Sequence, residues 1–362
     1  MIAQTFRMLS SSGTDRVTWM RAWTLTGREP FAHPGYLELF SPPGGEAVCA
    51  LLETPEGVWM LPLLLRRLDS ESWARDSEYR DATSPYGYGG PYGDGANPPD
   101  ELWDLLMAWM AQHQVVSMFG RLALEVPVPG RLPKGAGVDG GTSNVVVDLT
   151  RPSDEQWRHY EHKVRKNVNK AQRAGLRAEV LSSFTDLEEF WRLYEATMDR
   201  RGALPWYHFG LDFFASLTET LAGSYRAAEV RDSDGRLVSA ELVLCSDSHL
   251  YSFLGGTLTE AFPQAPNDLL KHSVIEDGRA AGRTGYVLGG GYAEDDGIYR
   301  YKKAFDPTGQ VPFHRLTLVV DQAAYDALTV MRLSHERSTD PLVSLDDRFF
   351  PAYRGYARKP KE

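Results

Sequence analysis

The sequence predicts an α+β protein with two domains, and three observations lead to this prediction. The chain has 362 residues, enough for two domains of ordinary size. Two pairs of β-prone runs, each joined by a turn, begin at residues 46 and 224, about 180 residues apart. The second half mixes helix-like segments with a run of successive strands, an order that predicts a mixed sheet rather than a purely parallel one.

The composition is that of a globular protein without a membrane segment. Hydrophobic residues make up 42% of the chain and charged residues 24%, both ordinary values. The apolar run 58–65 is too short to span a bilayer, and residues 1–16 lack the pattern of a signal peptide. Cys49 and Cys245 fall in strand-like runs and indicate buried free thiols. We therefore expect a cytoplasmic protein.

The predicted first domain contains a clear hairpin. Residues 46–53 and 58–68 are β-prone, and Pro55 and Gly57 lie in the turn between them. The Pro- and Gly-rich stretch 126–144 follows later and predicts an inter-domain connection.

The second half begins with a strand at 144–150 and continues with helices. Ser153 and Gln156 form a capping-box pattern, which predicts one helix from Ser153 to about Gly175. Thr185 and Glu188 repeat this pattern before a helix whose apolar face is formed by Leu187, Phe190, Leu193 and Tyr194. The remaining predicted elements are a helix at 209–222, a three-stranded meander at 224–256, a helix at 267–282, and strands at 285–291 and 312–320.

Residues 162–180 concentrate positive charge in a chain whose net charge is −10. Val164, Val168, Ala171 and Gly175 form a narrow apolar stripe, and most of the basic residues fall off it. Such a run is usual for a solvated helix face. However, residues 162–178 contain no acid, so the charges repel one another unless an anion such as phosphate binds. Both interpretations stay open at this point.

Residues 162–176 resemble the signature helix of the FemABX family, peptidyltransferases built from GNAT-like domains. Arg165, Ala171 and Gly175 match the spacing of the family pattern. Four further segments resemble family motifs in the expected order, at 84–92, 197–203, 288–305 and 348–354. The third of these carries an aromatic-Lys-x-x-Phe motif formed by Tyr301, Lys302 and Phe305.

This resemblance implies two tandem GNAT-like domains, each with a mixed central sheet flanked by helices, and a C-terminal segment that returns to the first domain. The implied N-terminal domain comprises 1–143 and about 311–362, and the C-terminal domain comprises 144–310. The implied reaction forms an amide bond by transferring an aminoacyl group from aminoacyl-tRNA to a small-molecule or peptide amine. Aminoacyl-tRNA is then a co-substrate, and no cofactor is expected.

The resemblance also implies roles for individual residues. Lys302 matches the family lysine near the scissile ester, where a cation stabilises the oxyanion of the tetrahedral intermediate. The plain alternative is a surface lysine beside Lys303. The implied substrate-binding residues are Arg200, Tyr86, Tyr88, Gly290 and Tyr301, and the implied tRNA- or phosphate-binding residues are Lys163, Arg165, Lys166, Lys170 and Arg173.

Local sequence leaves two questions about the ligands open. The loop around Tyr86 and Tyr88 is glycine-rich, which suits either a tight turn or a close approach to a ligand. The junction 255–270 lacks Arg and Lys, which disfavours the phosphate site expected for acyl-CoA before a helix. Acyl-CoA-dependent N-acylation is therefore the second hypothesis, and a non-catalytic RNA-binding module is the third. The nine histidines are scattered, so we expect no metal site.

Overall fold

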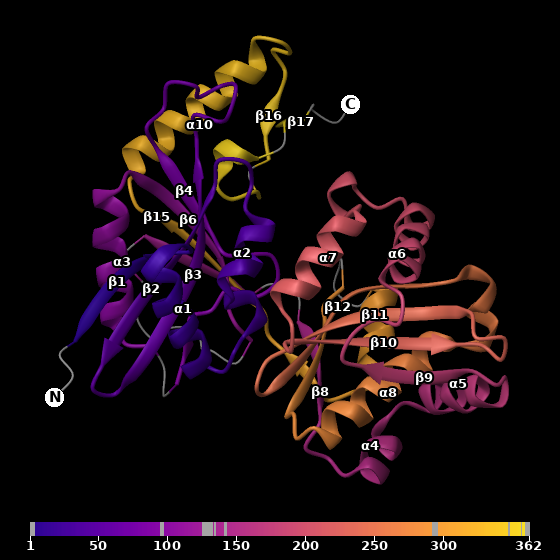
Figure 1. The fold of residues 1–362 in the computed structure, drawn as a ribbon. Helices are drawn as coiled ribbons and strands as arrows, with labels where there is room; N and C mark the ends of the chain where they lie inside the picture. Colours follow the sequence, from indigo (N-terminus) through magenta and orange to yellow (C-terminus); the bar gives the residue numbers. More distant parts are fainter. Residues whose placement is uncertain are drawn as a thin grey trace. The chain divides into compact units, whose positions relative to one another are not determined.

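The computed structural model describes residues 4–94, 98–124, 133, 135–140, 143–291, 296–346, 348–355 and 357–358. The chain divides into two compact units (Figure 1). Unit 1 comprises Met1–Gly27, Phe31–Gly141 and Phe313–Glu362, and unit 2 comprises Arg28–Pro30 and Thr142–Pro312. Each unit is built around one mixed sheet with helices packed on it, which confirms the predicted α+β class.

The sheet of unit 1 has the order β1-β2-β3-β4-β6-β15-β7, with β5 paired to β3. Its strands are β1 (Thr5–Ser10), β2 (Glu46–Thr54), β3 (Gly57–Arg67), β4 (Arg80–Thr83), β5 (Tyr92–Gly93), β6 (Val115–Arg121), β7 (Ala136–Gly140) and β15 (His314–Val319). The predicted hairpin is confirmed as β2 and β3, where Thr54 pairs with Gly57 across the turn. Among the described strand pairs of this sheet, only β4 and β6 run parallel.

Helices cover both faces of the unit 1 sheet. Even-numbered residues of β2 pack in one core cluster with α3 (Asp100–Gln112), and its odd-numbered residues pack in another with α1 (Gly13–Leu25) and α2 (Pro34–Phe40). This alternation follows from the two-residue period of a strand. Because both faces are covered, β2 is apolar on both sides rather than on one.

The C-terminal part of the chain completes unit 1. β15 pairs with both β6 and β7, and α10 (Gln322–Arg337) follows it. The segment 348–354 is then anchored to the core: the Tyr353 hydroxyl lies 2.7 Å from that of Ser117, and Arg354 Nε donates to Asp81 at 2.5 Å. The return of the C-terminal segment to the first domain is thus confirmed.

The stretch 126–144 is more than a connection, because it contains β7. Residues 126–132, 134 and 141–142 of this stretch lie outside the described residues. β7 gives β15 a hydrogen-bonding partner on its second edge, which satisfies backbone groups that water would otherwise have to solvate. Gly137 permits the pairing, since a Cβ there would lie 2.9 Å from Thr317 Oγ1. Gly137 therefore reflects a crowded strand rather than a linker.

The sheet of unit 2 has the order β14-β8-β13-β12-β11-β10-β9. Its strands are β8 (Asn144–Asp148), β9 (Arg177–Leu181), β10 (Tyr225–Arg231), β11 (Leu237–Cys245), β12 (His249–Thr257), β13 (Gly285–Gly289) and β14 (Gln310–Val311). The predicted meander is confirmed as β10, β11 and β12. β12 and β13 are parallel and pair only from His249 to Tyr251, so the rest of β12 leaves β13.

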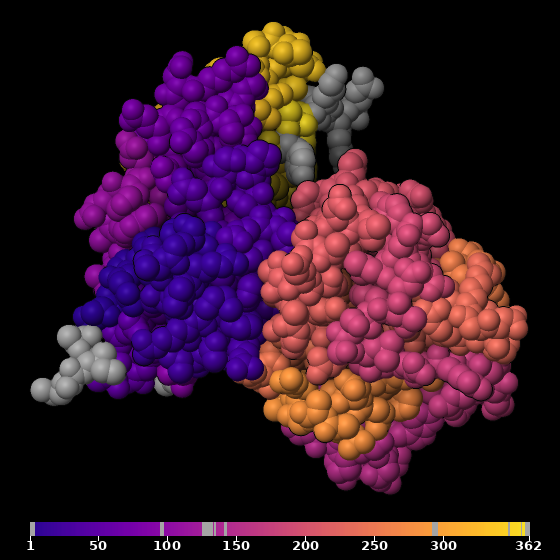
Figure 2. All heavy atoms as spheres, viewed as in Figure 1, coloured from indigo at the N-terminus to yellow at the C-terminus, as the bar shows by residue number. Residues whose placement is uncertain are grey.

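Helices also cover both faces of the unit 2 sheet. α5 (His162–Arg173) and α8 (Pro266–Ala280) pack on one face, and α6 (Leu187–Arg201) and α7 (Leu211–Thr220) on the other (Figure 1). Figure 2 shows the heavy atoms of the chain from the same side as Figure 1. Short helices α4 (Ser153–His159) and α9 (Gly297–Lys303) complete the unit.

The single helix predicted from Ser153 to Gly175 is wrong, because the chain breaks at Tyr160 between α4 and α5. Tertiary contacts explain the break. Tyr160 is buried, its hydroxyl lies 3.2 Å from His272 Nδ1, and the Glu161 amide donates to the Ala304 carbonyl. Ser153 is not a cap either, since its hydroxyl donates to Glu276. The predicted end at Gly175 is confirmed, with φ of +79°.

The cap predicted for α6 is displaced by one residue. Asp186, not Thr185, accepts hydrogen bonds from the amides of Glu188 and Glu189. The Thr185 amide instead donates to Glu229 at 2.7 Å. The predicted apolar face is confirmed for Phe190, Leu193 and Tyr194, which are buried.

Both cysteines are buried free thiols, as predicted, and burial raises the pKa of Cys245 to about 11. Among the residues that the structure describes, no helix combines the length and the hydropathy needed to cross a bilayer.

The apolar stripe of α5 belongs to the core of unit 2, because Val164, Val168 and Ala171 are fully buried. A substitution in this stripe tests the assignment. We expect Val168→Asp to unfold unit 2, since an unpaired buried carboxylate costs several kcal/mol, a large part of a total stability of roughly 5–15 kcal/mol. Thermal melting followed by circular dichroism measures this. Asn169→Asp, on the exposed side of the same helix, is the control and should melt like the wild type. A Val168→Asp variant that melts normally would contradict the assignment.

Candidate functional site

Lys302 lies at the end of α9 and reaches the end of β13. Its ammonium donates to the Gly290 carbonyl at 2.6 Å. Gly289 makes this approach possible: its φ is +80°, and a Cβ there would lie 3.3 Å from Lys302 Nζ. Asp296 fixes the start of α9 by accepting from the Tyr299 amide at 2.7 Å. The structure therefore brings Lys302 and Gly290 together, and Lys302 is not a plain surface lysine.

Burial is the main cause that lowers the pKa of Lys302, the nearby Lys271 ammonium acts in the same direction, and the resulting pKa is about 8. Glu241 and Asp296 act in the opposite direction and keep the shift moderate. The side chain is thus a cation at neutral pH, held in a place where water screens it poorly. Such a cation can stabilise a developing negative charge more strongly than an exposed one.

Lys271 and Glu241 form a buried ion pair close to Lys302. Lys271 Nζ donates to Glu241 at 2.5 Å, to Ser252 at 2.7 Å and to the Tyr286 hydroxyl at 3.1 Å. The Tyr286 hydroxyl donates to the other oxygen of Glu241 at 2.7 Å. All three ammonium hydrogens have acceptors, which offsets the cost of burying the charges.

The sequence interpretation missed this network, although signals for it exist. Lys271 lies on the buried face of α8 between Leu270 and Val274. Glu241 is the one charged residue of β11, whose residues are all buried. A charged residue in each of two buried patterns indicates a pair.

Tyr301 precedes Lys302 and packs edge-to-face on Phe305, with ring centroids 5.4 Å apart. Its hydroxyl is buried and has no hydrogen-bond partner among the described residues. Burial raises its pKa well above the usual value, and the carboxylates of Asp268 and Glu241 add to this. A buried donor without an acceptor is costly, so this hydroxyl is suited to donate to a bound group.

The basic residues of α5 do not form one uniform set. Arg165 Nη1 donates to the carbonyls of Arg158 and Tyr160 at the end of α4, so it supports the helix break. Lys163 pairs with Glu161 at 3.2 Å. Lys166, Lys170 and Arg173 are exposed and have no ion-pair partner in the described part of the chain.

Arg200 connects α6 to the end of β12. Its guanidinium donates to the Thr257 carbonyl at 2.9 Å and to Thr259 at 3.3 Å, and it stacks over Phe262 at 4.9 Å. Burial lowers the pKa of Arg200, and the charge of Arg201 lowers it further. These contacts give Arg200 a structural role that the sequence did not indicate.

Tyr86 and Tyr88 belong to an aromatic cluster of unit 1. The Tyr86 carbonyl accepts from Tyr36 at 2.8 Å, and the Tyr88 carbonyl accepts from Tyr92 at 2.8 Å. Gly87, with φ of +97°, fits a turn against Phe31, whose ring would lie 2.4 Å from a Cβ. The glycines of this loop are therefore explained by tight packing.

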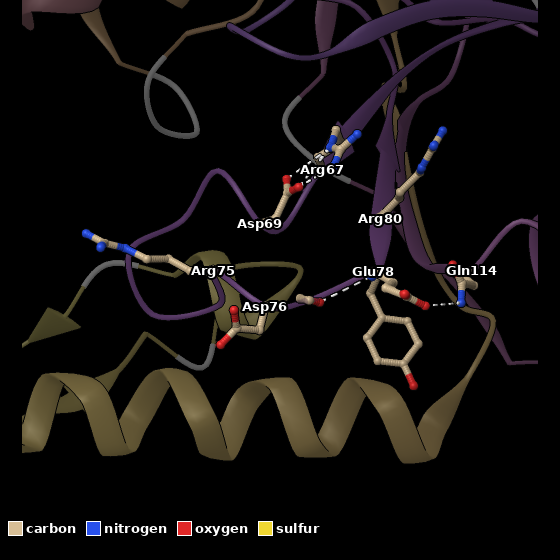
Figure 3. A pocket seen from close by; sticks show the side chains of 9 residues that line it. Arg67, Asp69, Arg75, Asp76, Glu78, Arg80 and Gln114 are labelled. Atoms are coloured by element: carbon tan, nitrogen blue, oxygen red, sulfur yellow. Dashed lines mark hydrogen bonds and ion pairs between the residues drawn. The ribbon is translucent and has the colours of Figure 1, made fainter.

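A cavity of about 380 Å³ in unit 1 is lined by charged side chains (Figure 3). Arg67 pairs with Asp69, and Gln114 donates to Glu78 at 3.3 Å. None of the predicted site residues lines it, and its charges of both signs do not favour one class of ligand.

Comparison with known proteins agrees with this architecture. Residues 158–303 match the family model of an acetyltransferase (GNAT) domain. The fold is similar to that of FemX, with a TM-score of 0.64 and 14% identity over 81% of this chain and 92% of that one. No curated protein matches the chain.

Two lysylphosphatidylglycerol synthetase structures are also similar. The C-terminal domain of a putative synthetase from Agrobacterium fabrum has a TM-score of 0.52 and 15% identity over 87% of this chain and 95% of that one. L-PGS from Bacillus licheniformis has a TM-score of 0.53 and 13% identity over 87% and 94%. The chain is an acyltransferase with a GNAT domain at residues 158–303, and its two units have a FemX-like fold.

Proposed function

We propose that this acyltransferase transfers an aminoacyl group from aminoacyl-tRNA to an amine and forms an amide bond. The observation that carries the proposal is the Lys302 ammonium, partly buried and held by the Gly290 carbonyl. The similarity of the fold to FemX supports it. A cytoplasmic location belongs to the proposal, since aminoacyl-tRNA is found there.

In the proposed reaction the acceptor amine attacks the ester carbonyl carbon of the aminoacyl-tRNA. The carbonyl oxygen becomes an oxyanion, the carbon–oxygen bond to the terminal ribose breaks, and a proton passes from the amine to the leaving hydroxyl. Lys302 has donors beyond the one used by Gly290 and stabilises the oxyanion. A donor of this kind contributes about 3–4 kcal/mol to lowering the barrier.

The exposed face of α5 is the proposed contact for tRNA phosphates. Lys166, Lys170 and Arg173 supply the charge, and the engaged Arg165 and Lys163 contribute less than the sequence suggested. Arg200, Tyr86, Tyr88, Gly290 and Tyr301 stay proposed substrate contacts. Of these, Tyr301 has the best support, since its hydroxyl lacks a partner among the described residues.

Acyl-CoA is the alternative donor, and the start of α8 argues against it. Asp268 lies in the first turn of α8, accepts from its own amide and from Asn167 at 3.1 Å, and is buried. A carboxylate therefore takes the position where a helix N-terminus would bind a pyrophosphate. A non-catalytic RNA-binding module, the third hypothesis, requires no role for Lys302 and leaves its buried position unexplained.

Substitution of Lys302 tests the proposed chemistry. We expect Lys302→Met to lower the rate about 10²–10³-fold without changing RNA affinity, because only the transition state loses a donor. The assay follows amine-dependent loss of amino acids from a total aminoacyl-tRNA pool, with mixed peptides and amino sugars as acceptors. Lys303→Met is the control. Transfer that is unchanged in Lys302→Met, or supported by acetyl-CoA alone, would contradict the proposal.

The same assay has an expected pH dependence. Because the pKa of Lys302 is lowered to about 8, the cation is present below this pH and is lost above it. The wild-type rate should therefore fall as the pH rises through about 8. In Lys302→Arg the rate should fall only at a higher pH, because arginine keeps its charge there.

Neutralising the exposed cations of α5 tests the RNA contact. We expect the triple variant Lys166→Gln, Lys170→Gln and Arg173→Gln to weaken tRNA binding. The slope of the logarithm of the binding constant against the logarithm of the salt concentration should become shallower by about 2–3, since each phosphate contact contributes about 0.7–0.9. Titrations at several salt concentrations measure both. The control replaces three cations that already have acidic partners, Arg158, Arg192 and Arg236, by Gln. Equal losses in the two variants would mean a general charge effect and would refute a specific contact.

Asp268→Asn tests whether a carboxylate is held at the start of α8. Burial raises the pKa of Asp268 to about 6, so the folded state binds this proton more tightly than the unfolded chain. Stability is then lost as the pH rises from about 4 to 6, and the cost is fully present at pH 7. Asp268→Asn should raise the free energy of unfolding by about 1–3 kcal/mol at pH 7 and should leave it almost unchanged at pH 4. Urea unfolding at both pH values measures this, and Asp212→Asn, in the exposed first turn of α7, should show no such difference.

A further inference from the structure

Three side chains that can ligate a metal converge on the outer side of α6, apart from the residues around Lys302. Glu195 and Asp199 lie one turn apart on this helix and therefore point to the same side. His208 follows the short 3-10 helix η2 (Pro205–Tyr207) and reaches back to them. The ligand atoms of the three residues all lie within 4.8 Å of one another, and His208 Nδ1 is 3.0 Å from Glu195 Oε2.

His208 is held in place from both sides. The carbonyl of Tyr207 accepts from the Tyr194 hydroxyl at 2.5 Å, and the carbonyl of Phe209 accepts from Trp191 Nε1 at 3.2 Å. Both donors belong to α6, so the backbone flanking His208 is fixed to the helix that carries the two carboxylates. The imidazole is thus positioned before any ligand binds, which lowers the entropic cost of binding.

The charges of this cluster favour a cation. Glu195 and Asp199 repel each other at this spacing when both are ionised. Within the described part of the chain, the Asp199 carboxylate has no ion-pair partner, and Glu195 has only the imidazole. An ion of charge +2 removes the repulsion and uses all three side chains.

We propose that Glu195, Asp199 and His208 bind a divalent transition metal of the Zn²⁺ class. Ligand bonds of about 2.0–2.2 Å in a tetrahedral ion place neighbouring ligand atoms about 3.3 Å apart, close to the 3.0 Å between His208 and Glu195. The exposed Asp199 can rotate to close the remaining gap. The nitrogen ligand selects against Mg²⁺ and Ca²⁺, which prefer oxygen. Water fills the open position.

The bound metal joins α6 to the loop that carries Leu204 and Trp206, which are 66% and 51% exposed. Three ligands from two segments restrict the loop more than the hydrogen bond between His208 and Glu195 does alone. The metal site therefore fixes how this apolar loop is presented on unit 2.

Calorimetric titration of ZnCl₂ into the EDTA-treated full chain tests the proposal, with thermal melting as a second readout. We expect one Zn²⁺ per chain and a metal-dependent rise in melting temperature. His208→Gln and Asp199→Asn should each weaken binding at least about tenfold, since even residues behind the ligands have effects of 10–100-fold. MgCl₂ should bind much more weakly than ZnCl₂.

His162→Gln and Glu188→Gln are the matched controls, because His162 is an exposed histidine elsewhere and Glu188 is an exposed acid of the same helix. Both should bind Zn²⁺ like the wild type. No metal-dependent shift in the wild type, an equal loss in His162→Gln and His208→Gln, or equal binding of Mg²⁺ and Zn²⁺ would each overturn the proposal. The melting temperature of His208→Gln without metal reports the hydrogen bond alone, so that contribution is separated from metal binding.

Discussion

The site of unit 2 depends on the buried ion pair between Lys271 and Glu241. With Ser252 and Tyr286 it joins α8, β11, β12 and β13 near the point where β12 leaves β13. Loss of one partner would leave a buried charge uncompensated, at a cost of about 3–5 kcal/mol. Burial is the main cause of the lowered pKa of Lys302, and the same Lys271 ammonium adds to it, so one interaction both joins these elements and contributes to the electrostatics of the proposed transfer site.

Neighbouring residues of α5 divide structural and proposed binding roles between them. Val164, Val168 and Ala171 fill the core, Arg165 binds the end of α4, and the exposed Lys166, Lys170 and Arg173 form the proposed phosphate contact. A helix with a fixed inner face presents its outer charges on a rigid support. Rigid support matters for phosphate recognition, because flexible lysines lose rotamer entropy on binding.

Local pattern was enough to predict the hairpin, the meander and the stripe of α5, since periods of 2 and 3.6 residues are recorded in the sequence itself. Local pattern failed to predict features that depend on contacts between residues far apart in the sequence. The break at Tyr160 depends on Ala304 and His272, and the cap of α6 moved because Glu229 binds the Thr185 amide. Family resemblance, rather than period, suggested the roles of Lys302 and Gly290, and their contact was found only in the structure. Lys271 pairs with Glu241 thirty residues away, and no spacing motif connects His208 to Glu195.

The place of β15 between β6 and β7 has a consequence for synthesis on the ribosome. Unit 1 begins the chain, yet its sheet is incomplete until residues 314–319 have been translated, whereas nearly all of unit 2 precedes them. Unit 2 can therefore fold while β6 still exposes an unpaired edge, and strands left in this state invite wrong pairing. Translation speed and chaperone binding in the interval between the synthesis of β6 and that of β15 would thus influence the yield of native protein.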